Sequence, residues 1–360
     1  MKKLLFSSNN LDIGGIERAL ITLINELSKK SDYEITLVLD KKEGLFINDV
    51  NDNIKIIEYN SCKSNNTILR KIINLLKRIC FILKHKNKYD FSASYATYSK
   101  MCSFVARTAS KNSNLWGHAD YMELYNNDKN RVIDFFSSIE FEKFKRIIFV
   151  SEEGKNSFLE IFPSLKDKVI VCNNLIDYSR IKQLSKEKIK LQKDKLFTFI
   201  NIGRHDEEQK KLSRIIEATK KLKEDNYKFK VIFVGDGKDT NKYKNMVRKY
   251  KLENYISFLG RKKNPYPYYL ISDAVILTSD YEGYPVVFQE SMVLNIPVLT
   301  TNVSGSTSIL ENNSGIVVNK NIEDIYNEMK NFIDKKYHFD NKFNTQEFNE
   351  NIMKKIEELI

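Results

Sequence analysis

The stretch that decides the fold is Thr278-Ser-Asp-Tyr-Glu-Gly-Tyr-Pro-Val-Val-Phe-Gln-Glu-Ser-Met-Val-Leu-Asn-Ile-Pro-Val298. A buried strand is predicted to end at Thr278, a loop carries Glu282 and Gly283, and a helix is predicted to begin near Pro285. Because the first N–H groups of a helix have no intrahelical partner, this helix presents free donors and its positive dipole end above the strand's carboxyl end. Such an arrangement is typical of a phosphate site in an α/β protein.

Outward from this stretch, short β-branched runs alternate with helical patterns along the chain, which indicates parallel sheets joined by crossover helices. Strands are predicted at residues 3–6, 34–39, 54–59, 91–95, 146–150, 168–172, 197–202, 230–234, 256–259, 274–278, 296–300 and 315–318, with a further short strand just before His118. Helices are predicted between them, for example at residues 16–27, 212–223, 242–250 and 322–333, and a last amphipathic helix at 344–360.

Both halves of the chain open with a strand, a glycine-containing loop and an amphipathic helix: Gly14-Gly15 follows the strand at 3–6, and Gly203-Arg204 follows the strand at 197–202. The length of 360 residues, at about 150 residues per domain, also predicts two domains. We therefore expect an α/β fold of two Rossmann-like, doubly wound domains facing across a cleft, residues 1–173 and 174–343. The helix at 344–360 is a candidate to pack back on the first domain. The Lys-rich segment 173–195 is the predicted linker between the domains.

The composition excludes several classes of protein. Hydrophobic residues make up 42% of the chain, which is ample for two cores and excludes wholesale disorder. The four cysteines, Cys62, Cys80, Cys102 and Cys172, show no C-x-x-C spacing, so neither a disulfide framework nor a thiolate zinc site is expected. The first apolar run is too short for a signal peptide and no run is long enough to span a membrane, so we expect a cytoplasmic protein.

The pair Glu282 and Glu290 resembles the Glu-x7-Glu motif of retaining glycosyltransferases with the GT-B fold, family 4, also called glycosyl transferases group 1. Further segments follow in the order that this family shows: Gly14-Gly-Ile-Glu-Arg18, Gly203-Arg204, Glu208-Gln-Lys-Lys-Leu212, Val234-Gly-Asp-Gly237, Phe258-Leu-Gly260 and Thr300-Thr-Asn302. One such motif is weak, and two glutamates eight residues apart occur often by chance. Their common order over essentially the whole chain is specific.

The resemblance implies a role for each matched residue on the donor side. Arg204 and Lys210 would neutralise the charge that develops on the diphosphate without a metal, and Lys211 stays open as the alternative to Lys210. Glu290 would accept hydrogen bonds from the ribose hydroxyls, and Glu282 would contact the transferred sugar. The predicted catalytic residues are Glu282, His118, Arg204 and Lys210, and the predicted donor-binding residues are Gly15, Gly203, Arg204, Lys210, Gly283, Tyr284, Val286, Val287 and Glu290.

His118 is predicted from the resemblance alone to donate a hydrogen bond near the donor phosphate and sugar, with Asp120 orienting it. A structural role is the open alternative, because a single histidine in a loop is often structural. Trp116, the only tryptophan, is expected in the core.

The expected function is transfer of a sugar from a nucleoside diphosphate sugar, most simply a UDP-sugar, to a saccharide or polyprenyl-linked acceptor in surface polysaccharide or glycolipid synthesis. No cofactor and no metal are expected. One alternative is a nucleotide-sugar epimerase of the same fold. Another is a basic nucleic-acid-binding protein, which the net charge of +12 permits, although no recognisable nucleic-acid module is present. A dinucleotide fingerprint at Gly14-Gly15 is incomplete, because the full G-x-G-x-x-G is absent.

The segment 68–88 predicts an amphipathic helix with a strongly basic side. Apolar residues fill one half of its helical wheel, and basic residues fill the other half together with Phe81. Two interpretations stay open: a crossover helix packed on the first sheet, or a helix whose basic side and Phe81 meet an anionic membrane surface. The second would place the protein at the inner face of the plasma membrane.

Overall fold

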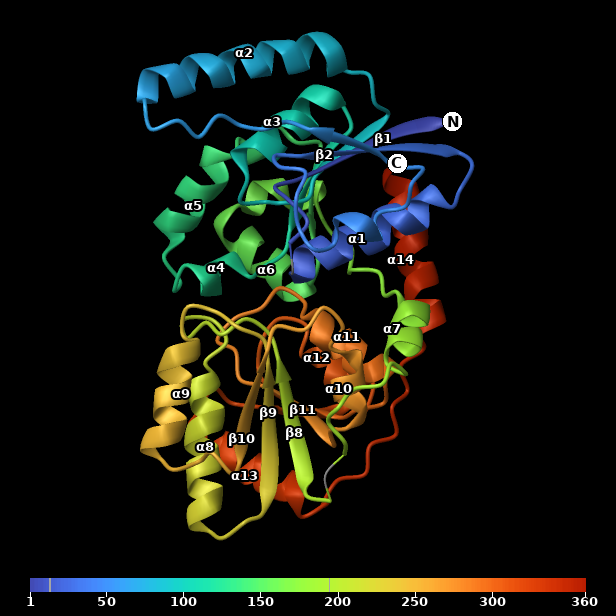
Figure 1. Ribbon diagram of the computed structural model, residues 1–360. Helices are drawn as coiled ribbons and strands as arrows, with labels where there is room; N and C mark the ends of the chain where they lie inside the picture. Colours follow the sequence, from blue (N-terminus) through green and yellow to red (C-terminus); the bar gives the residue numbers. More distant parts are fainter. Residues whose placement is uncertain (13, 194) are drawn as a thin grey trace. The chain divides into compact units, whose positions relative to one another are not determined.

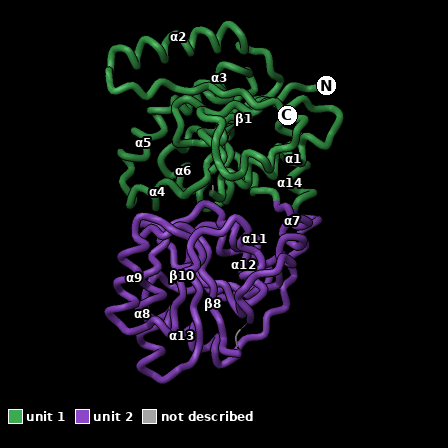
Figure 2. The backbone as a smooth tube through the Cα atoms, viewed as in Figure 1, with its two compact units in different colours: residues 1–175, 349–360 green, residues 176–348 purple. Residues whose placement is uncertain are grey.

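The computed structural model describes residues 1–12, 14–193 and 195–360. The chain forms two compact units, which Figure 2 shows in different colours: unit 1 contains residues 1–175 and 349–360, and unit 2 contains residues 176–348. The expected boundary lay after residue 173. The described part of the chain holds no helix of the length and apolarity that a membrane crossing requires.

Unit 1 is built on a parallel sheet of seven strands in the order β3-β2-β1-β4-β5-β6-β7. The strands are β1 Lys2–Ser8, β2 Tyr33–Leu39, β3 Lys55–Glu58, β4 Phe91–Ser94, β5 Ser113–Gly117, β6 Arg146–Phe149 and β7 Val169–Val171. The helices are α1 Gly15–Ser28, α2 Thr67–His85, α3 Lys100–Ala109, α4 Tyr121–Leu124, α5 Lys129–Ser138 and α6 Glu152–Ile161, with 3₁₀ turns η1 Ile47–Asp49, η2 Phe141–Lys143 and η3 Pro163–Lys168 (Figure 1).

Unit 2 is a second parallel sheet, of six strands in the order β10-β9-β8-β11-β12-β13. Its strands are β8 Phe197–Ile202, β9 Phe229–Val234, β10 Ile256–Gly260, β11 Ala274–Leu277, β12 Val298–Thr301 and β13 Gly315–Val318. Its helices are α7 Tyr178–Leu184, α8 Leu212–Glu224, α9 Thr240–Lys249, α10 Tyr266–Leu270, α11 Val286–Val293, α12 Thr307–Glu311 and α13 Ile322–Ile333; α14, Thr345–Leu359, begins in unit 2 and continues in unit 1.

The predicted architecture of two doubly wound α/β domains is confirmed. Each predicted strand overlaps an observed one, and the ends differ by at most two residues. The central strands are apolar on both faces, as parallel strands covered by helices must be: Leu4, Leu5 and Phe6 of β1 are all fully buried.

The predicted linker 173–195 is only partly a linker. It contains α7, and Ile176 and Ile181 are buried in the apolar core of unit 2 with Ile200 and Phe288. Its lysines suggested a solvated segment, but two isoleucines on one side of a short helix are enough to pack it on the domain.

Helix α2 packs on the rest of unit 1 through the side that carries Phe81, although one interpretation of the sequence placed this side chain at a membrane surface. Phe81 does not point to solvent; it is only 6% exposed and packs with Leu5, Val38 and Val105. The basic side of α2 faces the same way: Arg78 lies over the Phe104 ring, 5.0 Å from its centroid, and Lys77 donates a hydrogen bond to the carbonyl of Asn60. The membrane interpretation that placed Phe81 in a bilayer is therefore wrong.

Candidate functional site

The candidate site in unit 2 lies where the strand order of its sheet reverses. Strands β9 and β10 lie on one side of β8, whereas β11, β12 and β13 lie on the other. The loops that follow β8 and β11 therefore leave neighbouring strands at the same edge of the sheet. In open α/β sheets, ligands bind at this reversal point, above the carboxyl ends of the strands.

The first pair brought together by these loops is Lys210 and Glu282. The Lys210 Nζ atom lies 2.5 Å from Glu282 Oε1, and the two side chains are only 16% and 9% exposed. The hydroxyl of Ser279 donates a second hydrogen bond to the same oxygen, at 2.6 Å. The Gln209 amide donates to the other carboxylate oxygen at 3.5 Å, so three donors fix the position of the carboxylate at the end of β11.

Lys211 occupies a different environment although it is the next residue. Its backbone is left-handed, with φ of 48°, at the residue before α8. Its Nζ atom lies 3.6 Å from Asp280, which also pairs with Arg214 at 2.6 Å. The left-handed residue turns the two adjacent lysine side chains toward different carboxylates.

Arg204, by contrast, is largely exposed at the mouth of the loop after β8. Its Nη2 atom donates to Gln209 Oε1 at 2.9 Å, and its Nε atom lies 4.0 Å from Asp206. Since the Lys210 charge is offset by Glu282, the Arg204 guanidinium is the cation of this loop that an incoming anion can reach with least competition.

The loop after β8 lies so close to the end of β9 that the residue there must be a glycine. Gly235 follows β9 with φ of +147°, and a Cβ atom there would lie 1.8 Å from the carbonyl oxygen of Gly203. The two backbones approach each other directly, which only glycine permits. The Gly203 and Gly235 motifs are therefore parts of one structural feature.

Glu290 lies one turn inside α11 and is buried among tyrosines. Tyr269 donates a hydrogen bond to Glu290 Oε2 at 2.7 Å, and Tyr266 donates to Oε1 at 3.1 Å. Burial, together with the Glu290 charge, raises the pKa of Tyr269 well above its usual value, so this hydroxyl stays a donor. Sequence reasoning missed these two partners; their i, i+3 spacing in α10 was the available signal.

The remaining predicted donor-binding residues form the entry to α11. Pro285 precedes the first helical residue, Val286. Gly283 and Val287 are buried, whereas Tyr284 is partly exposed. Tyr284 is positioned by Gly305, whose φ is +83° and whose Cβ, if present, would lie 2.7 Å from the tyrosine ring. The α11 amides are thus presented at the same strand end as Glu282.

Two predicted residues lie in unit 1. Gly15 is the exposed first residue of α1. His118 follows β5 and lies against the Tyr95 ring, with 4.6 Å between ring centroids. Burial lowers the pKa of His118 to about 3, and its Nε2 atom is buried without a hydrogen-bond partner among the described residues. The imidazole is therefore neutral at physiological pH.

Asp120 does not orient His118 as predicted. Its carboxylate accepts hydrogen bonds from the backbone N–H groups of Met122 and Glu123 and from the Ser157 hydroxyl. It caps α4, a common use of aspartate. Trp116 is almost fully buried in β5, as predicted. Within the described ranges, no group of three or more His, Cys, Asp or Glu side chains is arranged to hold a metal ion.

Residues 182–354 match the family model described as glycosyl transferases group 1. This chain carries a glycosyl transferases group 1 domain. The domain spans almost all of unit 2, including Lys210, Glu282 and Glu290. It marks the chain as a glycosyltransferase enzyme.

Three curated relatives bear glycosyltransferase names. An uncharacterized glycosyltransferase, MJ1059, of Methanocaldococcus jannaschii is 32% identical over 266 residues, which are 70% of this glycosyltransferase chain and 65% of the relative. The N-acetylgalactosamine-N,N'-diacetylbacillosaminyl-diphospho-undecaprenol 4-alpha-N-acetylgalactosaminyltransferase of Campylobacter jejuni is 25% identical over 84% of this chain and 81% of its own length. The amylovoran biosynthesis glycosyltransferase AmsD of Erwinia amylovora is 24% identical over 34% of each chain.

Solved structures confirm the GT-B fold of this glycosyltransferase chain. The Anabaena protein Alr3699/HepE, solved in complex with UDP-glucose, has a TM-score of 0.76 and 16% identity, covering 99% of this chain and 100% of its own. Neither the epimerase nor the nucleic-acid-binding alternative is favoured by these similarities.

Proposed function

We propose that this glycosyltransferase transfers a sugar from a UDP-sugar to a saccharide or lipid-linked acceptor, with retention of anomeric configuration, in surface polysaccharide or glycolipid synthesis. The observation that carries the proposal is the Lys210–Glu282 pair beside the N-terminus of α11, at the strand-order reversal of a group 1 domain. The UDP-glucose complex of the structurally similar HepE supports the choice of donor.

The donor diphosphate is held, in this proposal, by Arg204, Lys210 and the first amides of α11. When the bond between the sugar and the β-phosphate breaks, negative charge grows on the phosphate oxygens. Two fixed cations and a helix N-terminus stabilise that charge without a metal ion. Arg204 supplies a planar fork and Lys210 a point charge, so the two are not interchangeable.

The two glutamates act at opposite ends of the donor. Glu290, deep in α11, accepts hydrogen bonds from the ribose hydroxyls, and its carboxylate has lone pairs beyond those that the two tyrosines use. Glu282 contacts hydroxyls of the sugar. Gly283, Tyr284, Val286 and Val287 surround the diphosphate, and Gly203 permits its close approach to the loop after β8.

Two residues of unit 1, His118 and Gly15, are assigned to the donor in this proposal. The neutral imidazole of His118 carries one donor nitrogen and one acceptor nitrogen, and the buried Nε2 atom lacks a partner among the described residues. We assign to this imidazole a hydrogen bond to the transferring sugar. We assign Gly15 to donor binding, through a close approach of the donor to its backbone. A lipid-linked acceptor agrees with the diphospho-undecaprenol acceptor in the name of the Campylobacter relative, and it implies peripheral contact with the inner face of the plasma membrane.

Incubation of the purified protein with UDP-, GDP- and CMP-sugars tests the proposal. Thermal unfolding identifies the donor, because a bound ligand raises the stability by RT ln(1 + [L]/Kd). NMR of the product formed with a polyprenyl-diphosphate or oligosaccharide acceptor then gives the anomeric configuration. Stabilisation by UDP-sugars and an α-linked product from an α-linked donor are expected. An inverted product, or epimerised donor formed without acceptor, would contradict the proposal.

A further inference from the structure

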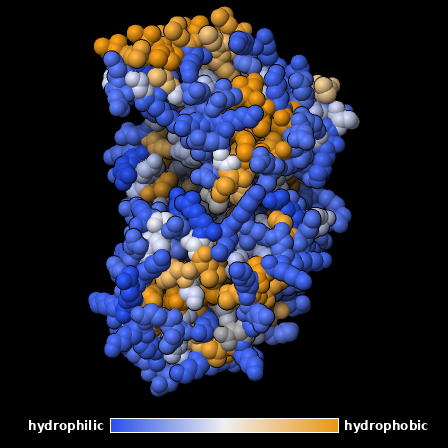
Figure 3. Space-filling view, in the orientation of Figure 1, coloured by the Kyte–Doolittle hydropathy of each residue, from blue (hydrophilic) through white to orange (hydrophobic). Residues whose placement is uncertain are grey.

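Helix α2 presents an unusual apolar surface to solvent. Among its 19 residues only Phe81 is buried, whereas eight large aliphatic side chains are exposed, with Leu83 at 75% and Ile68 at 72%. The eight are Ile68, Leu69, Ile72, Leu75, Leu76, Ile79, Ile82 and Leu83. Figure 3 shows the resulting hydrophobic band over α2. Contiguous apolar patches of this kind on a protein surface mark interaction sites.

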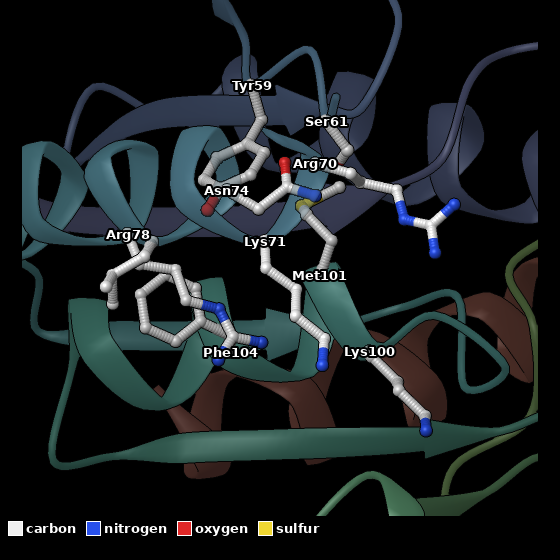
Figure 4. A pocket seen from close by; sticks show the side chains of 10 residues that line it. Tyr59, Ser61, Arg70, Lys71, Asn74, Arg78, Lys100, Met101 and Phe104 are labelled. Carbon is white, nitrogen blue, oxygen red and sulfur yellow. The ribbon is translucent and has the colours of Figure 1, made fainter. Parts of the chain in front are cut away.

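A pocket of about 430 Å³ lies between this helix and α3 (Figure 4). Arg70, Lys71 and Arg78 of α2 line it, and Lys100 of α3 completes a set of four cations. The rings of Tyr59 and Phe104 form part of its wall, and the Arg78 guanidinium overlies the latter. No carboxylate lines the pocket.

The four cations are not neutralised by the protein. None of them forms an ion pair with another described side chain, and Arg70 donates only to the carbonyl of Ser64, at 3.2 Å. Asp40, which accepts a hydrogen bond from the Ser61 backbone, pairs instead with Lys63. Four uncompensated cations around one cavity repel one another, and an anion with several oxygen acceptors relieves that repulsion.

We propose that this pocket binds the phosphate head group of an anionic membrane lipid while the exposed apolar side of α2 lies in the bilayer interface. A soluble anion would explain the cations but not the aliphatic row, and an apolar protein partner would explain the row but not the cations. A lipid has both parts, because its anionic head group is joined to apolar acyl chains. Amphipathic helices that lie in the interface combine these features.

The proposal deepens the proposed function and rests on it in one respect: a lipid-linked acceptor brings the enzyme to the membrane. It also differs from the membrane interpretation that the sequence left open, in which the basic side and Phe81 met the membrane. The aliphatic side of α2 enters the bilayer interface, and the basic residues that line the pocket bind the phosphate head group.

Sedimentation of the full chain with vesicles tests the proposal. At low salt, the wild type should bind vesicles of phosphatidylcholine with phosphatidylglycerol and not those of phosphatidylcholine alone. Lys71→Ala with Lys100→Ala should lower the partition coefficient about 30-fold, the effect of two basic residues near an anionic surface. Both side chains are exposed, so the fold is not at risk.

A matched control has the same change of charge on the far part of unit 1. Lys129 of α5 and Lys166 of η3 are exposed and form no ion pair with other described residues, so Lys129→Ala with Lys166→Ala should bind as the wild type does. Leu76→Ser with Leu83→Ser should also weaken binding to the anionic vesicles. Equal losses in the control and in the pocket variant would overturn the proposal, because binding would then follow total charge.

Inorganic diphosphate separates a soluble anion from a lipid. If it binds the pocket, as judged by calorimetry on wild type and pocket variant, and the leucine variant still sediments fully, the site takes a soluble anion and the proposal is wrong. UDP binding, measured on every variant, separates this proposal from the function. A protein that binds UDP but no vesicle contradicts only the lipid site, and one that binds vesicles but no UDP contradicts only the proposed function.

Discussion

At the scale of single residues, the ion pair between Lys210 and Glu282 distinguishes two neighbouring lysines. Lys210 reaches the carboxylate at the end of β11, whereas Lys211 pairs with Asp280. A cation that is already positioned needs little reorganisation when charge develops on a ligand, and this preorganisation is the main source of electrostatic catalysis.

We therefore predict that Lys210→Ala lowers kcat by about 10²-fold or more, as loss of one preorganised donor does. Lys211→Ala should change kcat little, and Arg204→Lys should not restore the activity lost in Arg204→Ala, because lysine has no bidentate fork. Initial rates with the donor that the thermal-unfolding screen selects provide the measurement. Similar losses in the Lys210 and Lys211 variants would show that the assignment is wrong.

The burial of Glu290 among tyrosines decides how its role is best tested. Glu290→Ala would leave two buried hydroxyls without their acceptor, at a cost of about 1–3 kcal/mol each. Glu290→Gln keeps an oxygen in place, and should weaken UDP binding roughly tenfold because hydrogen bonds to a charged acceptor are the stronger ones. Glu282→Gln should lower turnover more than UDP affinity. Calorimetry with UDP checks both variants, and equal losses of affinity would contradict the division of roles.

The lowered pKa of His118 leads to a specific prediction about how the free energy of unfolding depends on pH. Burial lowers its folded-state pKa to about 3, below the unfolded value near 6.5, so the unfolded chain binds the extra proton in mild acid. The stability is unaffected above pH 6.5 and falls as the pH decreases toward 3, by at most about 1.4 kcal/mol per pH unit. In His118→Gln this part of the decrease should vanish. Denaturant unfolding of both proteins at pH 7 and pH 5 tests it, and parallel decreases would exclude the effect.

At the scale of elements, α2 is anchored by one aromatic side chain. Phe81 contacts the rings of Tyr59, His85 and Phe104 and packs on the core of unit 1. Phe81→Ala should cost about 3–5 kcal/mol of the free energy of unfolding, as for other buried phenylalanines. Leu83→Ala, two residues later, should cost almost nothing because that side chain is exposed. The reverse result would mean that α2 packs through its aliphatic side.

At the scale of the whole molecule, the charge argument predicts independence from metal ions. In the proposed function, Arg204, Lys210 and the α11 N-terminus supply the positive charge that a divalent cation supplies in other transferases. UDP at 100 times its Kd should therefore stabilise the chain by about 2.7 kcal/mol, with or without EDTA. Thermal unfolding and initial rates measure this. Strict dependence on magnesium or manganese would contradict the argument.

The sequence by itself determined the two doubly wound sheets and pointed to the candidate site at the start of α11. Buried parallel strands read as β-branched runs, and the glutamate motif sits where a strand ends and a helix begins, so these features are local along the chain. Strand bounds agreed to within one or two residues for the same reason.

Only the tertiary structure decided which side chains meet. Lys210 and Lys211 are alike in sequence, and it is the left-handed backbone at Lys211 that separates them. Tyr266 and Tyr269 reach Glu290 across some twenty residues of chain. The orientation of α2 was equally undetermined, because either half of its wheel could pack; the shape of the core beside Val38 and Val105 admitted Phe81 and left the aliphatic row to solvent.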